Sequence, residues 1–80
     1  MTITLKYFGQ IAELTHKKEE VMVWDETTNS ITLLQSKLEL LYPELKNTHY
    51  SFAVNQKLAT AISPVSNQDE IALLPPFAGG

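Results

Sequence analysis

The sequence predicts an α+β fold, in which one mixed β-sheet of about five strands is crossed by one main helix. Residues 2–7 (TITLKY) alternate between polar and apolar side chains, as half-buried strands do. Residues 30–43 (SITLLQSKLELLYP) instead carry apolar side chains at helical spacing. Short apolar runs then follow, separated by turn-forming residues. Strands on both sides of a single long helix favour a sheet that this helix covers on one face.

The first predicted strand has one apolar face. Ile3, Leu5 and Tyr7 share that face, because successive side chains of a strand point in opposite directions. Phe8 falls on the opposite side, so we expect it to be exposed. Gly9 then breaks the strand.

A short helical turn and a second strand are expected next. Ile11 and Leu14 stand three residues apart, which suits one turn of helix. Residues 20–24 (EVMVW) are rich in strand-forming side chains. Between them, residues 16–20 (HKKEE) are polar, and we expect this charged run to be a solvated hairpin.

The main helix is expected in residues 30–43, with an apolar stripe that faces the sheet. The stripe has spacings of three and four and consists of Ile31, Leu34, Leu38, Leu41 and Leu45. Ser30 or Asn29 can cap the start of the helix by accepting a backbone N–H. Pro43 should end it within about one turn, because the residue before a proline disfavours helical geometry.

The second half of the chain predicts three more strands. Residues 50–62 (YSFAVNQKLATAI) indicate two short strands joined by a hairpin turn at Asn55-Gln56. Residues 63–70 are loop material. Residues 70–74 (EIALL) are almost continuously apolar, so we expect this strand to be central in the sheet and buried on both faces. Pro75-Pro76 end it, because proline lacks the N–H that a ladder needs.

The order of elements favours a β-grasp roll. The long helix supplies the crossover that first and last strands need in order to pair in parallel. We therefore expect a β-grasp domain over residues 1–74 and a flexible, extended C-terminal tail over residues 75–80 (PPFAGG).

Composition excludes several kinds of protein. Eighty residues form one small domain with a modest core. The charge of −3 with six lysines and no arginine gives no basic stripe for nucleic acid. No cysteine is present, which excludes disulfides and thiolate chemistry. The start of the chain is unlike a signal peptide and no apolar run is long enough for a membrane span, so we expect a cytoplasmic protein.

No ordinary catalytic pattern is found. His16 and His49 are far apart in polar connections, so we expect no metal site. Adjacent acids such as Glu19-Glu20 point to opposite faces of a strand and do not form an acid–base pair. Nucleotide-binding glycine motifs and nucleophile elbows are absent from the sequence as well.

The tail is the most unusual feature of the sequence. Two of the three glycines are Gly79 and Gly80. The two prolines hold the segment extended, and glycines can thread a channel too narrow for a side chain. A carboxylate becomes reactive only after activation, for instance by adenylation with ATP. Because the chain has no ATP-binding motif and no cysteine, an activating partner and an external source of sulfur are implied if the carboxylate is used.

Five segments resemble the ubiquitin-like sulfur carriers of the ThiS/MoaD family, most closely the small-subunit type of molybdopterin synthase. They are ITLKYFGQIAELT, SITLLQSKL, AVNQKLA, NQDEIALLPP and the final AGG. The resemblance implies that an adenylyltransferase of the ubiquitin-activating type uses ATP to adenylate Gly80. A sulfur donor then converts it to a thiocarboxylate, which donates sulfur to the cyclic pyranopterin precursor in molybdenum cofactor biosynthesis. The resemblance also implies that the carrier is not catalytic alone and binds no cofactor itself.

The same resemblance implies the partner contacts. The tail residues Gly79, Ala78 and Phe77 thread into the large synthase subunit, in an assembly of two large and two small subunits. Phe8, Leu58 and Leu74 form the apolar contact surface, although Leu58 and Leu74 are equally compatible with the core.

Two positions depart from the family pattern. Many relatives carry arginine where this chain has Ala12, and an aromatic residue where it has Leu74, so the details of partner contact are open. The same pattern also fits a sulfur carrier of another pathway, such as thiazole synthesis. A third interpretation is a ubiquitin-like interaction module whose terminal glycines have no role.

Overall fold

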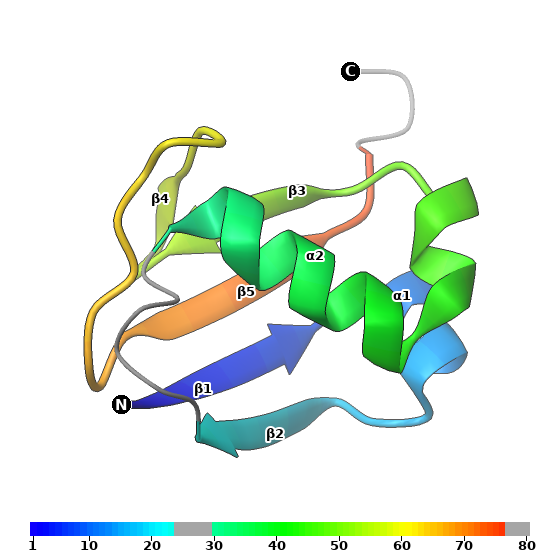
Figure 1. Cartoon of the computed structure of the whole chain (residues 1–80). Coiled ribbons are helices and arrows are strands. Elements are labelled where there is room, and N and C mark those ends of the chain that lie inside the picture. The colour runs from blue at the N-terminus through cyan, green and yellow to red at the C-terminus, as the bar shows by residue number, and fades with distance from the viewer. Residues whose placement is uncertain (24–29, 77–80) are drawn as a thin grey trace.

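The computed structural model describes residues 1–23 and 30–76, which fold into one sheet with helices on one side (Figure 1). The elements follow one another as β1 (Thr2–Tyr7), α1 (Gln10–Thr15), β2 (Glu19–Val23), α2 (Ile31–Leu41), the 3-10 helix η1 (Pro43–Asn47), β3 (Ser51–Val54), β4 (Lys57–Leu58) and β5 (Glu70–Leu74). Trp24, at the end of the second predicted strand, and Asn29 lie outside the described residues.

The sheet has five strands in the order β2-β1-β5-β3-β4. β1 and β5 pair in parallel, with Leu5 opposite Ile71. The pairs β1–β2, β3–β5 and β3–β4 are antiparallel. The predicted mixed sheet, the parallel first and last strands and the central place of the last strand are therefore confirmed, and the arrangement is a β-grasp roll.

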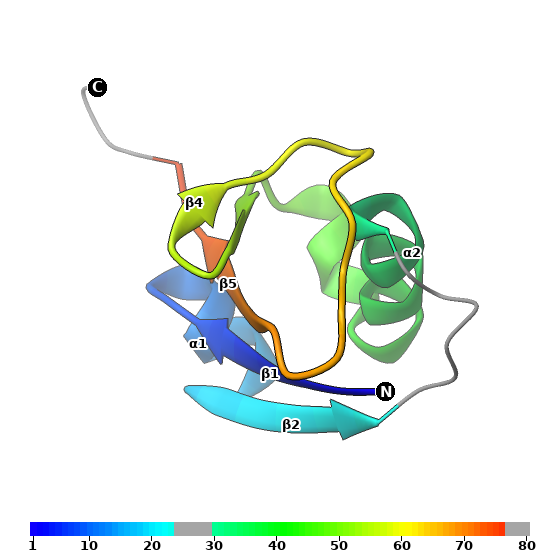
Figure 2. The ribbon, with the colours of Figure 1, turned by 90° about the vertical axis from the view of Figure 1, so that its left-hand side faces the viewer.

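Helix α2 crosses the sheet on one face, as Figure 2 shows edge-on. Ser30 is the N-cap, and its side chain accepts a hydrogen bond from the Leu33 N–H at 3.4 Å. The predicted apolar stripe is wrong at one position, since Leu41 is 55% exposed. Tyr42 ends the helix and Pro43 opens η1. That change of helical geometry turns the chain, so Leu45 reaches the core and Leu41 does not.

One hydrophobic core fills the space between the sheet and the helices. Its members come from every layer of the fold: Ile3, Leu5, Tyr7, Ile11, Met22, Ile31, Leu34, Leu38, Leu45, Phe52, Val65, Ile71 and Leu73. The alternation predicted for residues 2–7 is confirmed, because Ile3, Leu5 and Tyr7 are buried. Burial of these side chains is the main term that stabilises a domain of this size.

The opposite face of the sheet carries no helix among the described residues. Burial alternates along β5, with Ile71 and Leu73 buried and Glu70, Ala72 and Leu74 only half-buried. The expectation that this strand is buried on both faces is therefore wrong. On the second face of β5, Ala72 and Leu74 stay partly exposed. A central strand usually packs such apolar side chains against a covering layer.

The β3–β4 hairpin turns at Asn55 and Gln56, as predicted. Both residues have positive φ, 49° and 71°, which is the geometry of a type I′ turn and matches the twist of the strands. The Asn55 side chain joins this turn to the start of β5: its Oδ1 accepts the Glu70 N–H at 3.0 Å, and its Nδ2 donates to Asp69 at 2.9 Å. The hairpin is therefore fixed beside the central strand.

Candidate partner-binding site

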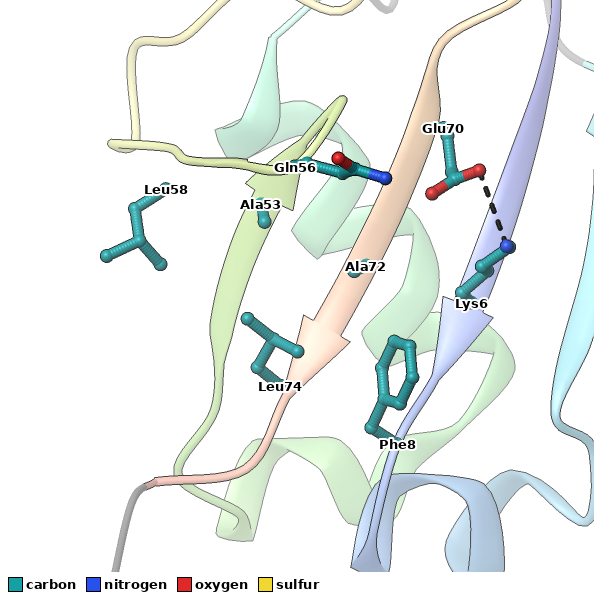
Figure 3. A pocket seen from close by; sticks show the side chains of 8 residues that line it. All are labelled: Lys6, Phe8, Ala53, Gln56, Leu58, Glu70, Ala72 and Leu74. Carbon is teal, nitrogen blue, oxygen red and sulfur yellow. Dashed lines mark ion pairs between the residues drawn. The ribbon is translucent and has the colours of Figure 1, made fainter.

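An open groove of about 460 Å³ lies on the uncovered face of the sheet (Figure 3). It is formed by β1, β5 and the β3–β4 hairpin, and its lining consists of Lys6, Phe8, Ala53, Gln56, Leu58, Glu70, Ala72 and Leu74. We call this the open-face groove. Small side chains at Ala53 and Ala72 form its floor, and larger ones stand around them.

Three large apolar side chains border the groove: Phe8 and Leu74 stand at the end where β5 leads into the tail, and Leu58 stands at the side, level with Ala53 (Figure 3). Phe8 is 45% exposed and Leu58 is 74% exposed. Leu74 is half-buried on the same face. The structure thus brings together the three residues that the resemblance assigns to partner contact, and neither Leu58 nor Leu74 belongs to the core cluster. Apolar side chains gathered in a depression are typical of a binding surface rather than of isolated exposed residues.

A charged pair borders the groove at its other end. Lys6 Nζ lies 3.4 Å from a Glu70 carboxylate oxygen, and both side chains are more than a third exposed. Such surface pairs contribute little to stability. Because the two charges lie beside an apolar depression, they are better placed to orient a partner than to stabilise the fold.

The tail begins at this groove. β5 runs through its floor and ends at Leu74, and Pro75 and Pro76 follow directly. Phe77, Ala78, Gly79 and Gly80 lie outside the described residues, so their predicted roles stay predictions, as does the division of the chain at residue 74. Ala12, the other position that departs from the family pattern, lies on α1 and packs partly buried against the core.

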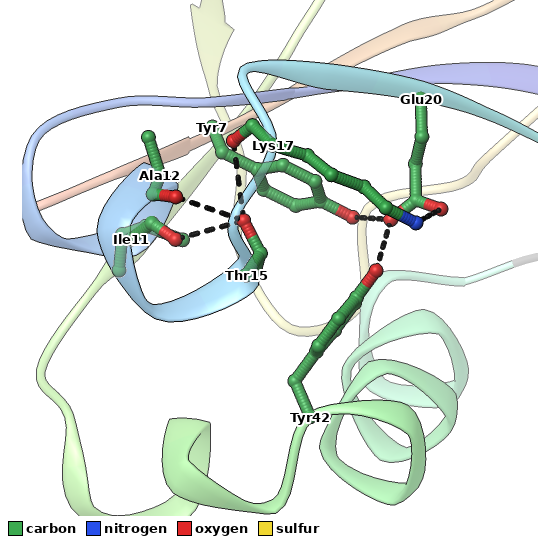
Figure 4. Close-up of polar contacts among 7 residues, drawn as sticks. All are labelled: Tyr7, Ile11, Ala12, Thr15, Lys17, Glu20 and Tyr42. Atoms are coloured by element: carbon green, nitrogen blue, oxygen red, sulfur yellow. Dashed lines mark hydrogen bonds and ion pairs between the residues drawn. The ribbon is translucent and has the colours of Figure 1, made fainter.

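A polar cluster that the sequence analysis did not predict is centred on Glu20, away from the open-face groove (Figure 4). One carboxylate oxygen of Glu20 accepts hydrogen bonds from the hydroxyls of Tyr7 at 2.5 Å and Tyr42 at 2.6 Å. The other oxygen accepts from Lys17 Nζ at 3.2 Å. This cluster, which we call the Glu20 cluster, joins β1, β2 and the end of α2. The expectation that the charged run of residues 16–20 is solvated is therefore wrong for Glu20, whose side chain is 20% exposed, whereas Lys17 is exposed as expected.

The electrostatics of the Glu20 cluster follow from its hydrogen bonds. Burial alone raises the pKa of the Glu20 carboxyl, but donation from Tyr42, Tyr7 and Lys17 lowers it by more, so this pKa lies below its ordinary value. Burial and then the bond to Glu20 raise the pKa of the Tyr7 hydroxyl far above its ordinary value. The carboxylate therefore stays charged and the hydroxyl stays a donor at neutral pH.

The sequence did contain a signal for this cluster. Glu20 and Met22 are two residues apart in β2, so their side chains point to the same face of the sheet. Glu20 pairs with the buried Leu5 across the two strands, so this face is the one that packs against the core. A carboxylate there needs donors, and the tyrosines at positions 7 and 42 are the amphipathic side chains that reach it.

The described residues provide neither a metal-binding cluster nor a membrane-spanning helix. Within residues 1–23 and 30–76 no group of three His, Asp or Glu side chains could hold a metal ion. Over the same residues, no helix has both the length and the apolar character needed to cross a membrane.

Known proteins show clear similarity to this chain. A model described as the ThiS family matches residues 5–80. The chain is 32% identical over 82 residues to the molybdopterin synthase sulfur carrier subunit of Mycobacterium tuberculosis, covering 98% of this chain and 96% of that protein.

Solved structures share the fold. SAMP1 from Haloferax volcanii, a small archaeal modifier protein, superposes with a TM-score of 0.82 at 21% identity over 100% of both chains. A chain in the complex of subunits 1 and 2 of the molybdopterin-converting factor from Helicobacter pylori gives 0.69 at 22% identity, again over 100% of both. The family model and the Mycobacterium tuberculosis relative, each matching nearly the whole length, establish that this chain belongs to the ThiS family.

Proposed function

We propose that this chain is a sulfur carrier that transports sulfur as a thiocarboxylate on Gly80. The observation that carries the proposal is the family match, which continues through the glycine pair to residue 80. In the first step a Gly80 carboxylate oxygen attacks the α-phosphate of ATP on an activating enzyme, and pyrophosphate leaves. In the second step hydrosulfide from a sulfur donor attacks the acyl carbon and AMP leaves, so that a C–S bond replaces the C–O bond to the phosphate and Gly80 carries a thiocarboxylate.

The geometry of the described residues supports this function. The open-face groove and the tail share one strand, since β5 forms the groove floor and leads into Pro75. A partner that binds the groove is therefore placed at the root of the tail. The two prolines would carry the following residues away from the sheet and into that partner. A docking surface that is separate from the reacting tail allows one carrier to bind more than one enzyme in turn.

We further propose that the acceptor is the large subunit of molybdopterin synthase, in an assembly of two large and two small subunits. The name of the Mycobacterium tuberculosis relative supports this pathway. The two-subunit complex from Helicobacter pylori supports a large-subunit partner. The sulfur would then enter a cyclic pyranopterin precursor during molybdenum cofactor biosynthesis.

A second function is attachment to other proteins through the same activated carboxylate. The observation in its favour is the superposition on SAMP1, which is named as a modifier protein. Both functions need the adenylate, but their products differ. A carrier gives a thiocarboxylate, whereas a modifier gives an amide between Gly80 and a lysine of its target.

The experiment is to incubate the chain with the activating enzyme, ATP and a sulfur source and to measure the intact mass. A sulfur carrier gains the mass difference between sulfur and oxygen, and it then supports sulfuration of the pterin precursor by the large subunit. Covalent adducts with other proteins, and no thiocarboxylate, would favour the modifier. An unchanged mass under all conditions would contradict both.

Phe8→Ala is expected to weaken binding to the large subunit by about 1–3 kcal/mol, because an exposed aromatic at the edge of a groove is typical of an interface anchor. Since Phe8 is 45% exposed, the variant should keep its thermal stability to within about 0.5–1 kcal/mol. Calorimetric titration measures the affinity. Leu40→Ala is the matched control, because Leu40 is 78% exposed on α2, away from the groove. Equal losses in the two variants, or none for Phe8→Ala, would refute the docking role.

A further inference from the structure

The root of the tail lies against the turn that follows β1. β1 and β5 are parallel neighbours, so both end on the same side of the sheet. The Phe8 N–H donates to the Leu73 carbonyl at 3.3 Å, which continues the ladder to the last residues of both strands. Beyond this bond the two segments take different courses: one enters α1 through Gly9, and the other enters the tail through Pro75.

Gly9 and Pro75 are in direct contact. A Cβ atom placed on Gly9 would lie 3.0 Å from Pro75 Cγ, 3.7 Å from its Cβ and 3.8 Å from its Cδ. A separation of 3.0 Å is closer than real Cβ atoms tolerate without movement of the neighbour. An added methyl group would therefore press on Pro75, which must give by a few tenths of an ångström through its ring pucker or through a shift of the first residue of the tail.

The backbone at Gly9 also requires glycine. Its φ of 55° and ψ of −133° fall in a region that residues with a Cβ rarely adopt. This conformation reverses the chain at once after Phe8 and starts α1. The Gly9 carbonyl accepts the N–H groups of Ala12 at 3.1 Å and Glu13 at 3.4 Å. Gly9 is therefore held by the first turn of α1 and forms a fixed surface against the proline.

We propose that Gly9 is a positioning residue that sets the direction in which the tail leaves the open-face groove. Pro75 packs on the bare backbone of Gly9, and this contact orients the tail relative to Phe8, the adjacent docking residue. A partner bound at Phe8 then receives the tail in one orientation. The inference rests on the proposed function. It adds that the turn at Phe8 and Gly9 both binds the partner and sets the orientation of the tail.

The test is a double-mutant cycle of Gly9→Ala and Pro75→Ala, read by adenylate formation at saturating carrier. Gly9→Ala should lower this maximal rate by about 10- to 100-fold, because small displacements of a reacting group have effects of that size. The affinity for the activating enzyme should change less than about twofold, since the groove is intact. Pro75→Ala removes Cγ, the atom in closest contact. In that background the part of the Gly9→Ala effect that comes from this contact is removed, so the loss in rate should be smaller, while the part that comes from the backbone conformation of Gly9 stays the same in both backgrounds.

The outcomes separate positioning from folding. Equal effects of Gly9→Ala in both backgrounds would mean that Gly9 acts only through its backbone conformation, and the proposal would be overturned. A loss confined to affinity would overturn it as well. A partner-free measurement supports the cycle: NMR of the native chain should show NOEs between the Gly9 Hα and Pro75 Hγ protons, and their absence would also refute the contact. If the native chain is never adenylated, the proposed function fails, while the NOEs still test the geometry.

Discussion

Extending the chain by one residue beyond Gly80 is expected to abolish thiocarboxylate formation. In the proposed function adenylation uses the α-carboxylate of Gly80 itself, and an added residue converts that carboxylate into an unreactive amide. Deleting Gly80 should have a similar effect, because one extended residue spans about 3.5 Å and misplacement by about 1 Å can cost a hundredfold in rate. Intact mass after incubation with the activating enzyme, ATP and sulfur source measures the result. One residue added before Met1 is the matched control and should charge normally.

Gly79 provides a graded version of the same test. Gly79→Val adds a branched side chain where the channel is proposed to admit backbone only, so transfer should fall far more than for Gly79→Ala. Ala78→Gly removes a methyl group instead of adding one and should be tolerated. Thermal stability should not change in any of these variants, since chain termini contribute little to a core. Normal charging of the extended chain together with normal transfer by Gly79→Val would leave the tail without a function.

Glu20→Gln is expected to destabilise the fold by about 1.5–3 kcal/mol, the cost of losing hydrogen bonds to a charged acceptor. Glutamine keeps one acceptor oxygen but cannot accept from Tyr7, Tyr42 and Lys17 together. For a domain of this length the loss corresponds to a fall in Tm of roughly 6–24 °C. Urea unfolding at pH 7 measures it. Glu19→Gln is the control, because the neighbouring Glu19 is exposed; a similar loss there would refute a specific role for the Glu20 cluster.

The same cluster gives the stability a dependence on pH. Because the pKa of Glu20 is lowered in the folded state, its contribution is fully present above the unfolded value of about 4.3 and is lost as the pH falls through the folded value. The difference in unfolding free energy between the native chain and Glu20→Gln should therefore be constant from pH 7 to about pH 5 and shrink at lower pH. A difference that grows on acidification would contradict this assignment.

Much of the fold could be predicted because local patterns and tertiary packing agree. The alternation in residues 2–7 and the turn residues Asn55-Gln56 both appear as expected in the structure. Leu41 was mispredicted because helical spacing continues through residues 41–45 while the helix does not. Only the change to a 3-10 helix at Pro43 decides which leucine is buried, and spacing carries no information on that change.

The candidate site was less accessible to sequence reasoning. The exposure of Phe8 could be predicted from the alternation of side chains along the strand, because Phe8 points to the face opposite Ile3 and Leu5. Leu58 and Leu74 could not be separated from the core by pattern, because short apolar runs fit either face, and only the resemblance marked them. The Glu20 cluster was missed because its partners come from three separated segments, which a one-dimensional pattern does not bring together.

The place of β5 in the sheet has a mechanical consequence. The strand that bears the tail is hydrogen-bonded on both sides, to β1 in parallel and to β3 in antiparallel. A pull on the tail along the strand axis loads both ladders in shear, so that many bonds must break at once. A tail attached to the edge strands β2 or β4 would instead let a strand be peeled off bond by bond. If the tail enters a tight channel as proposed, this placement lets the tail be drawn out again while the domain that carries it stays folded.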